Sequence, residues 1–332
     1  MSETAGKRQE VLSELLLNRH TLLVVVEFTL FCIINIISIV GNVLVLMAFY
    51  RNPSLRTSAN FYIVSLAVGD IILATLAMPL CCVSAFLGRW IFGNVACWLQ
   101  ASLAVMLGTT SLVTLALIAA NRLLTVVYPN THRRLVSRTT ILLSLLFAWF
   151  ATAAMPFLFY LTGVTNMFHP GFLLCLFDFS TVSYALVIPI AVFETFLPYQ
   201  VIFVCYFKIW RFPRNHNAQM FASAVNPDEI RLNRLLASIV ISFSICFTPF
   251  SVVILLESSR ERILVPREVY VFATVMVGLA SCVNPVIYGI MNSQFRREFS
   301  AIFRGRRARK IGVVNDEPQR NEGTEMHSVH VH

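Results

Sequence analysis

The stretch "LAVMLGTTSLVTLALIAANRLLTVVYP", residues 103–129, contains no charged residue until Arg122. An apolar run of about 20 residues is long enough to cross the hydrocarbon core of a bilayer as a helix. Arginine is costly at membrane depth and is retained mainly where it faces the protein interior or water. The stretch therefore predicts a membrane-spanning helix that ends at a functional arginine.

The whole chain has the composition of a membrane protein. Its 332 residues are 57% hydrophobic and 13% charged, whereas soluble domains carry about 25% charged residues. Seven runs are too long and too uniformly apolar for soluble core helices or barrel strands. They are 22–50, 59–86, 95–127, 138–161, 182–210, 231–256 and 268–290. The fold class expected is an all-α membrane protein, a bundle of seven transmembrane helices.

Lysine and arginine counts orient the bundle, because these residues concentrate in cytoplasmic connections. With the N-terminus outside, the outer segments hold seven of the 26, and the remaining 19 lie inside. The outer seven are Lys7, Arg8, Arg19, Arg89, Arg260, Arg262 and Arg267. We therefore expect a polar extracellular tail at 1–21, a membrane domain at 22–290, an amphipathic helix at 291–303 and a cytoplasmic tail at 304–332.

Two features follow the last span. In "SQFRREFSAIFRG", residues 293–305, the apolar residues Phe295, Phe299, Ile302 and Phe303 form one stripe, which is typical of a helix lying in the membrane interface. The run "RGRRARK" at 304–310 is basic. Directly after a span, such a run is expected to contact anionic lipid rather than nucleic acid.

The eight cysteines divide by their depth in the membrane. Six lie inside predicted spans and are interpreted as small apolar residues. Cys97 and Cys175 lie on the outer side, where an oxidising compartment favours a disulfide between them over two free thiols. No spacing typical of a metal site is present, so no metal is predicted.

Polar residues within the spans are functional candidates, since lipid does not solvate them. The inner-half set is Asn42, Asp70, Ser111, Asn121, Arg122 and Asn284. Asp70 is expected either to be protonated or to be partnered by Asn42, Ser111 and Asn284 around a cation or water. Pro198, Pro249 and Pro285 supply kinks. Kinked helices around a buried polar cluster suggest a bundle that moves.

Motifs occur once per helix and in order: "GNVLV", "SLAVGD", Cys97 with "NR", Trp149, Pro198 with Tyr206, "CFTP", and "NPVIY" with the amphipathic helix. From Leu22 to Arg307 the sequence thus resembles the rhodopsin-like G-protein-coupled receptors. The resemblance implies a plasma-membrane receptor, not an enzyme, in which an extracellular ligand makes the sixth helix swing outward. A heterotrimeric G protein then docks inside.

The resemblance also implies residue roles. Arg122, beside Asn121, is the arginine that contacts the G protein, and Glu229 is its resting-state partner. Tyr206 and Tyr288 stabilise the active inner cavity, although an interfacial anchor is the alternative for Tyr206. Asn284 and Pro285 belong to the switch motif of the last helix. Because Asn121 cannot restrain Arg122 by charge, we expect ligand-independent signalling.

The cytoplasmic half is similar to melatonin receptors, in "YRNPSLRTSANFYIVSLAVGD", "NR", "CYFKIW" and "YGIMNSQFRREF". This similarity implies inhibitory coupling by analogy. The outer half differs from melatonin receptors at three positions. Glu194 replaces their histidine, Phe159 replaces their asparagine, and Phe179 corresponds approximately to their glutamine. Phe177 matches a ligand-stacking position of those receptors. Glu194 is a candidate for ligand contact, for a structural hydrogen bond, or for a lipid-facing position.

Two further differences from known receptors narrow the range of candidate ligands. Ala104 stands where amine receptors carry aspartate, and Gly278 where opsins carry the retinal lysine. The apolar outer loop around Phe172 favours a compact hydrophobic or aromatic ligand, unless it merely plugs the bundle. The expected pocket comprises Val105, Gly108, Thr109, Phe177, Glu194, Phe247 and Phe250.

Some alternatives stay open at this point. The ligand could be a lipid or a peptide, or the receptor could be constitutively active. A transporter or channel is the remote alternative, since the third and fifth spans have apolar outer halves apart from Glu194.

Phe247 stands where the sixth-helix motif usually has tryptophan, which alters the switch beneath the ligand. Ala280 replaces a common polar partner, so a sodium ion at Asp70 and Ser111 is expected to bind weakly.

Overall fold

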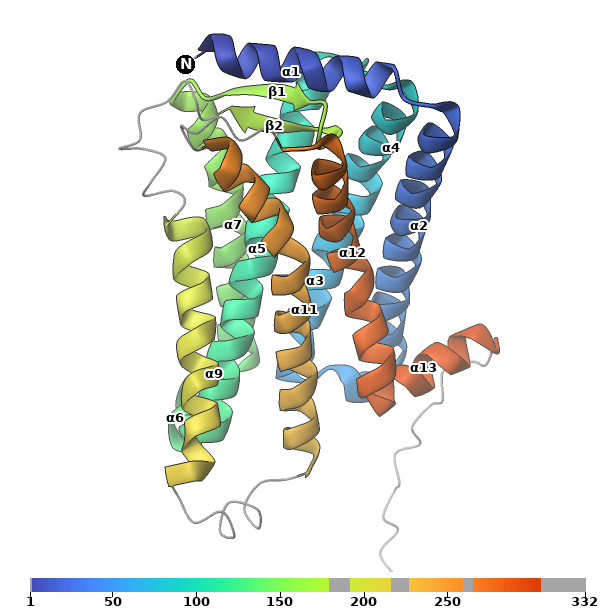
Figure 1. Cartoon of the computed structure of the whole chain (residues 1–332). Coiled ribbons are helices and arrows are strands. Elements are labelled where there is room, and N and C mark those ends of the chain that lie inside the picture. The colour runs from blue at the N-terminus through green and yellow to red at the C-terminus, as the bar shows by residue number, and fades with distance from the viewer. Residues whose placement is uncertain (1, 179–191, 216–226, 259–264, 306–332) are drawn as a thin grey trace, which may run out of the picture.

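The computed structural model describes residues 2–178, 192–215, 227–258 and 265–305. The chain folds as a bundle of long helices, with α1 and a β-hairpin at one end and α13 at the other (Figure 1). We call these the hairpin end and the α13 end. The elements are α1 (Ser2–Leu17), α2 (Thr21–Arg51), α3 (Ser58–Ile72), α4 (Met78–Leu87), α5 (Gly93–Val127), α6 (Pro129–Leu135), α7 (Arg138–Leu161), β1 (Thr165–His169), β2 (Leu174–Asp178), α9 (Leu197–Asn215), α11 (Pro227–Ser258), α12 (Arg267–Met291) and α13 (Ser293–Phe303).

The predicted spans match the helices closely. Among the described residues, six helices are long and apolar enough to cross a membrane. They are Thr21–Arg51, Ala59–Leu87, Gly93–Val127, Arg138–Leu161, Arg231–Leu256 and Arg267–Met291. The fifth predicted span is described from Val192 onward and contains α9. The seven-helix bundle is therefore confirmed.

The bundle places polar residues inside and large apolar residues outside. In α2, Ser38 and Asn42 are fully buried, whereas Ile36 is 60% exposed and Val40 is 50% exposed. Lipid solvates apolar side chains as well as a protein core does, so nothing drives them inward. Polar side chains have partners only within the bundle.

Within the described residues two π-helical turns occur, each shortly before a proline. Residues Leu73–Ala77 precede Pro79, and residues Val192–Phe196 precede Pro198. Proline lacks the amide hydrogen and clashes with the carbonyl one turn earlier, and a π-helical turn is one way for a helix to absorb that defect. A π-helical turn thus lies beside Pro198, where a kink is expected, while the turn before Pro79 was not predicted.

Residues 2–17, within the segment expected as a polar tail, form helix α1, which lies across the hairpin end (Figure 1). Two leucines spaced four residues apart, Leu12 and Leu16, are buried. They fall on one face of the helix, which packs onto the bundle. This helix covers the region where a ligand cavity is expected (Figure 1).

The hairpin comprises β1 and β2, paired antiparallel with Phe168 opposite Cys175 and His169 opposite Leu174. A disulfide joins Cys175 to Cys97 in α5, so the predicted bridge is confirmed. The six other cysteines are free thiols. The bridge anchors β2 to the first turn of α5 and holds the hairpin over the bundle.

Helix α13 begins at Ser293, where the Asn292 side chain accepts hydrogen bonds from the backbone N–H groups of Gln294 and Phe295. Phe295 is buried and its ring lies 5.7 Å from that of Tyr288. Phe303, at the end of the predicted apolar stripe, is 74% exposed. The basic run 304–310 lies outside the described residues after Gly305, so its lipid contact stays a prediction.

Candidate functional site

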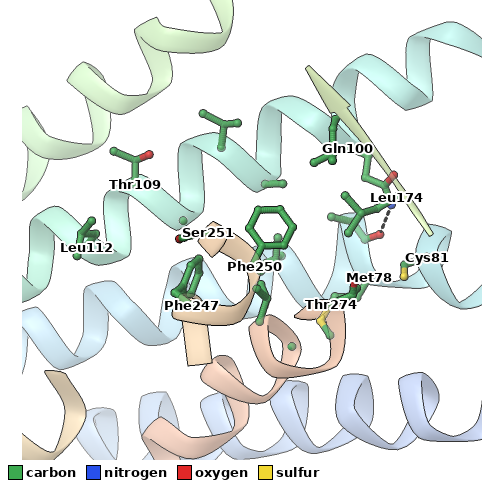
Figure 2. Close-up of a pocket in the computed structure, with 18 of the residues that line it drawn as sticks. Met78, Cys81, Gln100, Thr109, Leu112, Leu174, Phe247, Phe250, Ser251 and Thr274 are labelled. Carbon is green, nitrogen blue, oxygen red and sulfur yellow. Dashed lines mark hydrogen bonds between the residues drawn. The ribbon is translucent and has the colours of Figure 1, made fainter. Parts of the chain in front are cut away.

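A cavity of about 300 Å³ lies in the hairpin half of the bundle, bounded by the second span, α5, α11, α12 and the hairpin (Figure 2). Five of the predicted pocket residues line it: Val105, Gly108, Thr109, Phe247 and Phe250. Three of these come from one face of α5, and the two rings come from α11. The sequence-based pocket therefore coincides largely with a real space.

Phe177 was expected in the pocket but is not among the described residues that line it. Its ring instead lies 5.0 Å from that of Phe159, edge to face, in a buried cluster near the disulfide. Successive side chains of a strand point to opposite faces. Leu174 and Leu176, on the other face of β2, line the cavity in its place.

Glu194 lies within the π-helical turn Val192–Phe196, and its side chain is outside the part that the structure describes. Its neighbour Thr195 lines the cavity, as does Tyr199 one turn further along. Contact between Glu194 and a ligand therefore stays a prediction. The position of the turn beside the cavity keeps that contact geometrically feasible.

The described lining residues carry no charge. Ala104 and Gly278, the two positions that the resemblance singled out, both line the cavity. A Cβ atom added at Gly278 would lie 3.0 Å from Ile34 Cγ2 and 3.3 Å from Met78 Cε. The wall at this point is therefore already closely packed, and the cavity is suited to a neutral, largely apolar molecule.

Gln100 is the polar residue that organises the roof of the cavity (Figure 2). Its Nε2 donates to the Ala77 carbonyl at 2.9 Å, and its Oε1 accepts from the Cys175 backbone N–H at 2.8 Å. Ala77 ends the π-helical turn of the second span, so one side chain links α5, that turn and β2. Sequence reasoning missed Gln100, although a buried amide within a span is a recognisable signal.

A polar cluster lies deeper in the bundle, around Asp70. The carboxylate accepts from Ser281 Oγ at 2.6 Å and from Asn284 Nδ2 at 3.2 Å. Asn42 Nδ2 donates to the carbonyls of Ser38 and Ser281 at 2.9 and 3.1 Å. A small cavity of about 20 Å³ borders Asp70 and Ser111. The predicted cluster forms, with Ser281 as an additional member.

Ser281 was missed, yet its position carried a signal. It lies three residues before Asn284 in α12, and residues with this spacing share a helix face. Ala280, which also borders the small cavity, offers no oxygen to it. Asp70 therefore receives its two hydrogen bonds from residues of the same α12 face.

At the α13 end, Asn121 and Arg122 are buried in α5. The hydroxyls of Tyr206 and Tyr288 are buried and, within the described part of the chain, have no hydrogen-bond partner. Glu229 lies in the first turn of α11, but its side chain is outside the described residues, so its pairing with Arg122 stays a prediction. Pro285 lies inside α12, packed close to Gly41 of α2.

The sequence and fold were compared with known proteins. The family model described as "7 transmembrane receptor (rhodopsin family)" matches residues 41–288. The melatonin receptor type 1A of Phodopus sungorus is 30% identical over 275 residues, covering 80% of this chain and 77% of that protein. The visual pigment-like receptor peropsin of Homo sapiens is 29% identical over 281 residues, covering 81% and 82%.

Among solved structures, the crystal structure of squid rhodopsin superposes with a TM-score of 0.75 at 25% identity, covering 85% of this chain and 86% of that one. The family consists of receptors rather than enzymes. The ordered helices, the disulfide, the polar cluster and these similarities agree, and the chain belongs to the rhodopsin family of seven-transmembrane receptors.

Proposed function

We propose that this receptor responds to a small, neutral, hydrophobic or aromatic ligand from outside the cell and activates a heterotrimeric G protein, of the inhibitory type by analogy with melatonin receptors. The observation that carries the proposal is the cavity of about 300 Å³ above the Asp70 cluster, whose described lining residues carry no charge. That volume lies at the lower end of the range for small-molecule sites, roughly 300–1,000 Å³.

The orientation proposed places the hairpin end outside and the α13 end in the cytoplasm, with the protein in the plasma membrane. The distribution of lysine and arginine supports it. So does the disulfide at the hairpin end, because disulfides persist in oxidising compartments. The ligand then approaches from the hairpin end, and the G protein from the side of Arg122.

A cationic amine is a poor candidate ligand because the described cavity wall has no carboxylate to pair with it. Melatonin, which gives the melatonin receptors their name, is a neutral aromatic molecule and so belongs to the class of ligand that suits this cavity. The chain differs from those receptors at Glu194 and Phe159, so we propose a related ligand with altered polar groups. A lipid is the second candidate, supported by the apolar lining.

For signal transfer we propose that ligand contact with Phe247 and Phe250 moves α11. This helix carries Pro249 between the cavity-lining residues Phe247 and Phe250. Its outward motion would open the buried surroundings of Arg122 to the G protein. The buried hydroxyls of Tyr206 and Tyr288 would then gain hydrogen-bond partners, and the switch residues Asn284 and Pro285 would move with α12.

We also retain the proposal of a weak allosteric sodium ion at Asp70. The adjoining cavity of about 20 Å³ has room for about one water-sized particle. Asp70 and Ser111 would supply oxygen ligands, which sodium requires. Both Asp70 oxygens already accept hydrogen bonds from α12, and Ala280 supplies no oxygen, which supports weak binding. When bound, the ion would add positive charge beside Asp70.

The test is a cyclic AMP assay in cells that express the wild type, Arg122→Ala, Gly108→Leu or Glu194→His at matched surface levels. A panel of neutral indoles, other aromatics and lipids is applied, with melatonin included. Gly108 has no neighbour closer than 3.8 Å to an added Cβ, so leucine there fills the cavity with little clash at its base. We expect a ligand that lowers cyclic AMP in the wild type and fails in Gly108→Leu and Arg122→Ala.

Each outcome bears on the site. A melatonin response that appears only in Glu194→His places the ligand beside the π-helical turn. A compound that acts equally on the wild type and on Gly108→Leu does not bind in this cavity, and the proposed site is then wrong.

A further inference from the structure

Helix α1 covers the hairpin end of the cavity with two buried leucines. Leu16 is 1% exposed and belongs to a buried apolar cluster that includes the cavity-lining residues Phe31, Cys81 and Cys82. Leu12 is 4% exposed and belongs to a second cluster with Phe172, against which Phe250 packs. The helix therefore adjoins the cavity walls on two sides rather than lying free above them.

Arg19, just after α1, fastens the end of this helix to the bundle. Its Nε donates to the Leu16 carbonyl at 2.8 Å, and its Nη2 donates to the Ala85 carbonyl at 2.6 Å. Its Nη1 pairs with Glu27 of α2. Carbonyls in the last turn of a helix lack partners within that helix, and a cation is favourable there. Arg19 thus caps the ends of α1 and α4 at once.

Glu27 has a second arginine partner that does not depend on α1. Arg267, the first residue of α12, donates two hydrogen bonds to the Glu27 carboxylate at 2.8 and 2.7 Å. This bidentate pair is balanced in charge and links α2 to α12. Arg19 adds a positive charge to an already neutral pair, so its removal leaves the pair between the spans intact.

Two effects of the surroundings act against the positive charge of Arg19. Its side chain is 3% exposed, and burial together with the charge of Arg267 opposes its own charge, while Glu27 favours it. The net effect lowers the pKa of Arg19, with burial as the main cause. Release of Arg19 to water would restore its hydration, which offsets part of the loss of its hydrogen bonds to the two carbonyls and to Glu27.

We propose that α1 is a lid over the ligand cavity and that Arg19 is its latch, so that a ligand arriving from water enters only after α1 lifts. The inference rests on the proposed function, because a lid has a role only over a cavity that receives a ligand. Opening separates Leu12 and Leu16 from the cavity walls and exposes Arg19 to water. The Glu27–Arg267 pair stays closed and keeps α2 and α12 together.

The cavity contains its own reporters, because the thiols of Cys81 and Cys82 line it. A positively charged, membrane-impermeant methanethiosulfonate reagent is applied to intact cells that express the full chain. Labelling of the Cys81→Ala/Cys82→Ala variant is subtracted as background, and the remaining labelling gives the reaction rate of Cys81 and Cys82. The variants are Arg19→Ala and Leu12→Ser/Leu16→Ser. The matched control is Val11→Ser/Leu15→Ser on the exposed face of α1, where both side chains are 52% exposed.

We expect slow labelling in the wild type and in the matched control. Arg19→Ala is expected to react about ten-fold faster or more, since one hydrogen bond to a charged group shifts a two-state population by roughly that factor. The Leu12→Ser/Leu16→Ser variant is expected to react at least as fast as Arg19→Ala. Labelling needs neither ligand nor G protein, so it reports on the lid even if the proposed function is wrong.

The lid is refuted if both Arg19→Ala and the leucine variant react at the wild-type rate while reaching the cell surface normally. It is also refuted if Val11→Ser/Leu15→Ser accelerates labelling as much as Leu12→Ser/Leu16→Ser does. The two lid variants disturb different contacts, so a folding defect in one leaves the other as an independent test.

Discussion

Gln100 is a single side chain that fastens the roof of the cavity to two other parts of the bundle. It hydrogen-bonds the Ala77 carbonyl and the Cys175 backbone N–H, at 2.9 and 2.8 Å. We expect Gln100→Leu to leave the Cys175 N–H unpaired and to remove one hydrogen bond from the Ala77 carbonyl, at a total cost of roughly 1–3 kcal/mol. The measurement is the melting temperature of the purified receptor in detergent, which should fall by several degrees.

The control for this substitution is the adjacent residue Leu99, which is 44% exposed. Leu99→Ala should leave the melting temperature nearly unchanged, because surface substitutions have small effects. An unchanged melting temperature in Gln100→Leu would contradict the assigned role. If the melting temperature fell by the same amount in Gln100→Leu and Leu99→Ala, that result would also contradict the assigned role of Gln100.

Individual site residues were predictable from the sequence where they belong to a motif or are polar residues within an apolar span. Asp70, Asn42, Ser111 and Asn284 do gather, because polar groups within lipid must find one another. Phe177 is not among the described lining residues, and its position after Cys175 does not reveal which face of β2 points toward the cavity. That face is set by the pairing of β2 with β1 and by the disulfide, and both are properties of the folded chain.

At the scale of elements, close packing of α2 against α12 depends on one glycine. A Cβ atom added at Gly41 would lie 2.9 and 3.0 Å from Pro285 Cγ and Cβ. The proline ring is rigid and cannot turn away, so we expect Gly41→Ala to push the two helices apart. Overpacking of this kind costs typically 1–3 kcal/mol. The readout is the midpoint of thermal inactivation, with surface expression measured in parallel.

Gly69→Ala provides the matched control within another span. An added Cβ there would lie 3.9 Å from Leu107 Cδ2, an ordinary contact. Because alanine also favours the helix more than glycine does, this variant should equal or exceed the wild type in stability. Equal effects of the two substitutions would show that the α2–α12 contact at Pro285 is not a tight one.

The helices themselves were largely predictable, and the exceptions have physical causes. Length and uniform apolarity determine a span, so the predicted and observed bounds agree to within a few residues. Helix α1 was missed because its polar sequence has no strong periodicity and is held by Leu12, Leu16 and Arg19 through tertiary contacts. Glu27 was overlooked too, although a carboxylate in the first apolar run is a clear signal.

For the whole molecule, we expect signalling without a ligand. Asn121 is neutral and cannot restrain Arg122 by charge, as an acidic residue would. Asn121→Asp should therefore lower basal activity. A salt bridge worth roughly 1 kcal/mol shifts a two-state population about fivefold. Basal cyclic AMP at equal surface expression tests this expectation. Basal activity equal to that of empty-vector cells would contradict it.

The most direct measurement is nucleotide exchange on a purified heterotrimeric G protein of the inhibitory class, catalysed by the purified receptor in lipid nanodiscs. Wild type and Arg122→Ala are compared at equal concentration, without ligand. We predict that the wild type accelerates exchange above the rate of the G protein alone, and that Arg122→Ala, of matched thermal stability, does not. Equal acceleration by both proteins would contradict the role of Arg122. If neither protein accelerates exchange on any G-protein class, with or without the neutral ligand panel, the chain does not act as a G-protein-activating receptor.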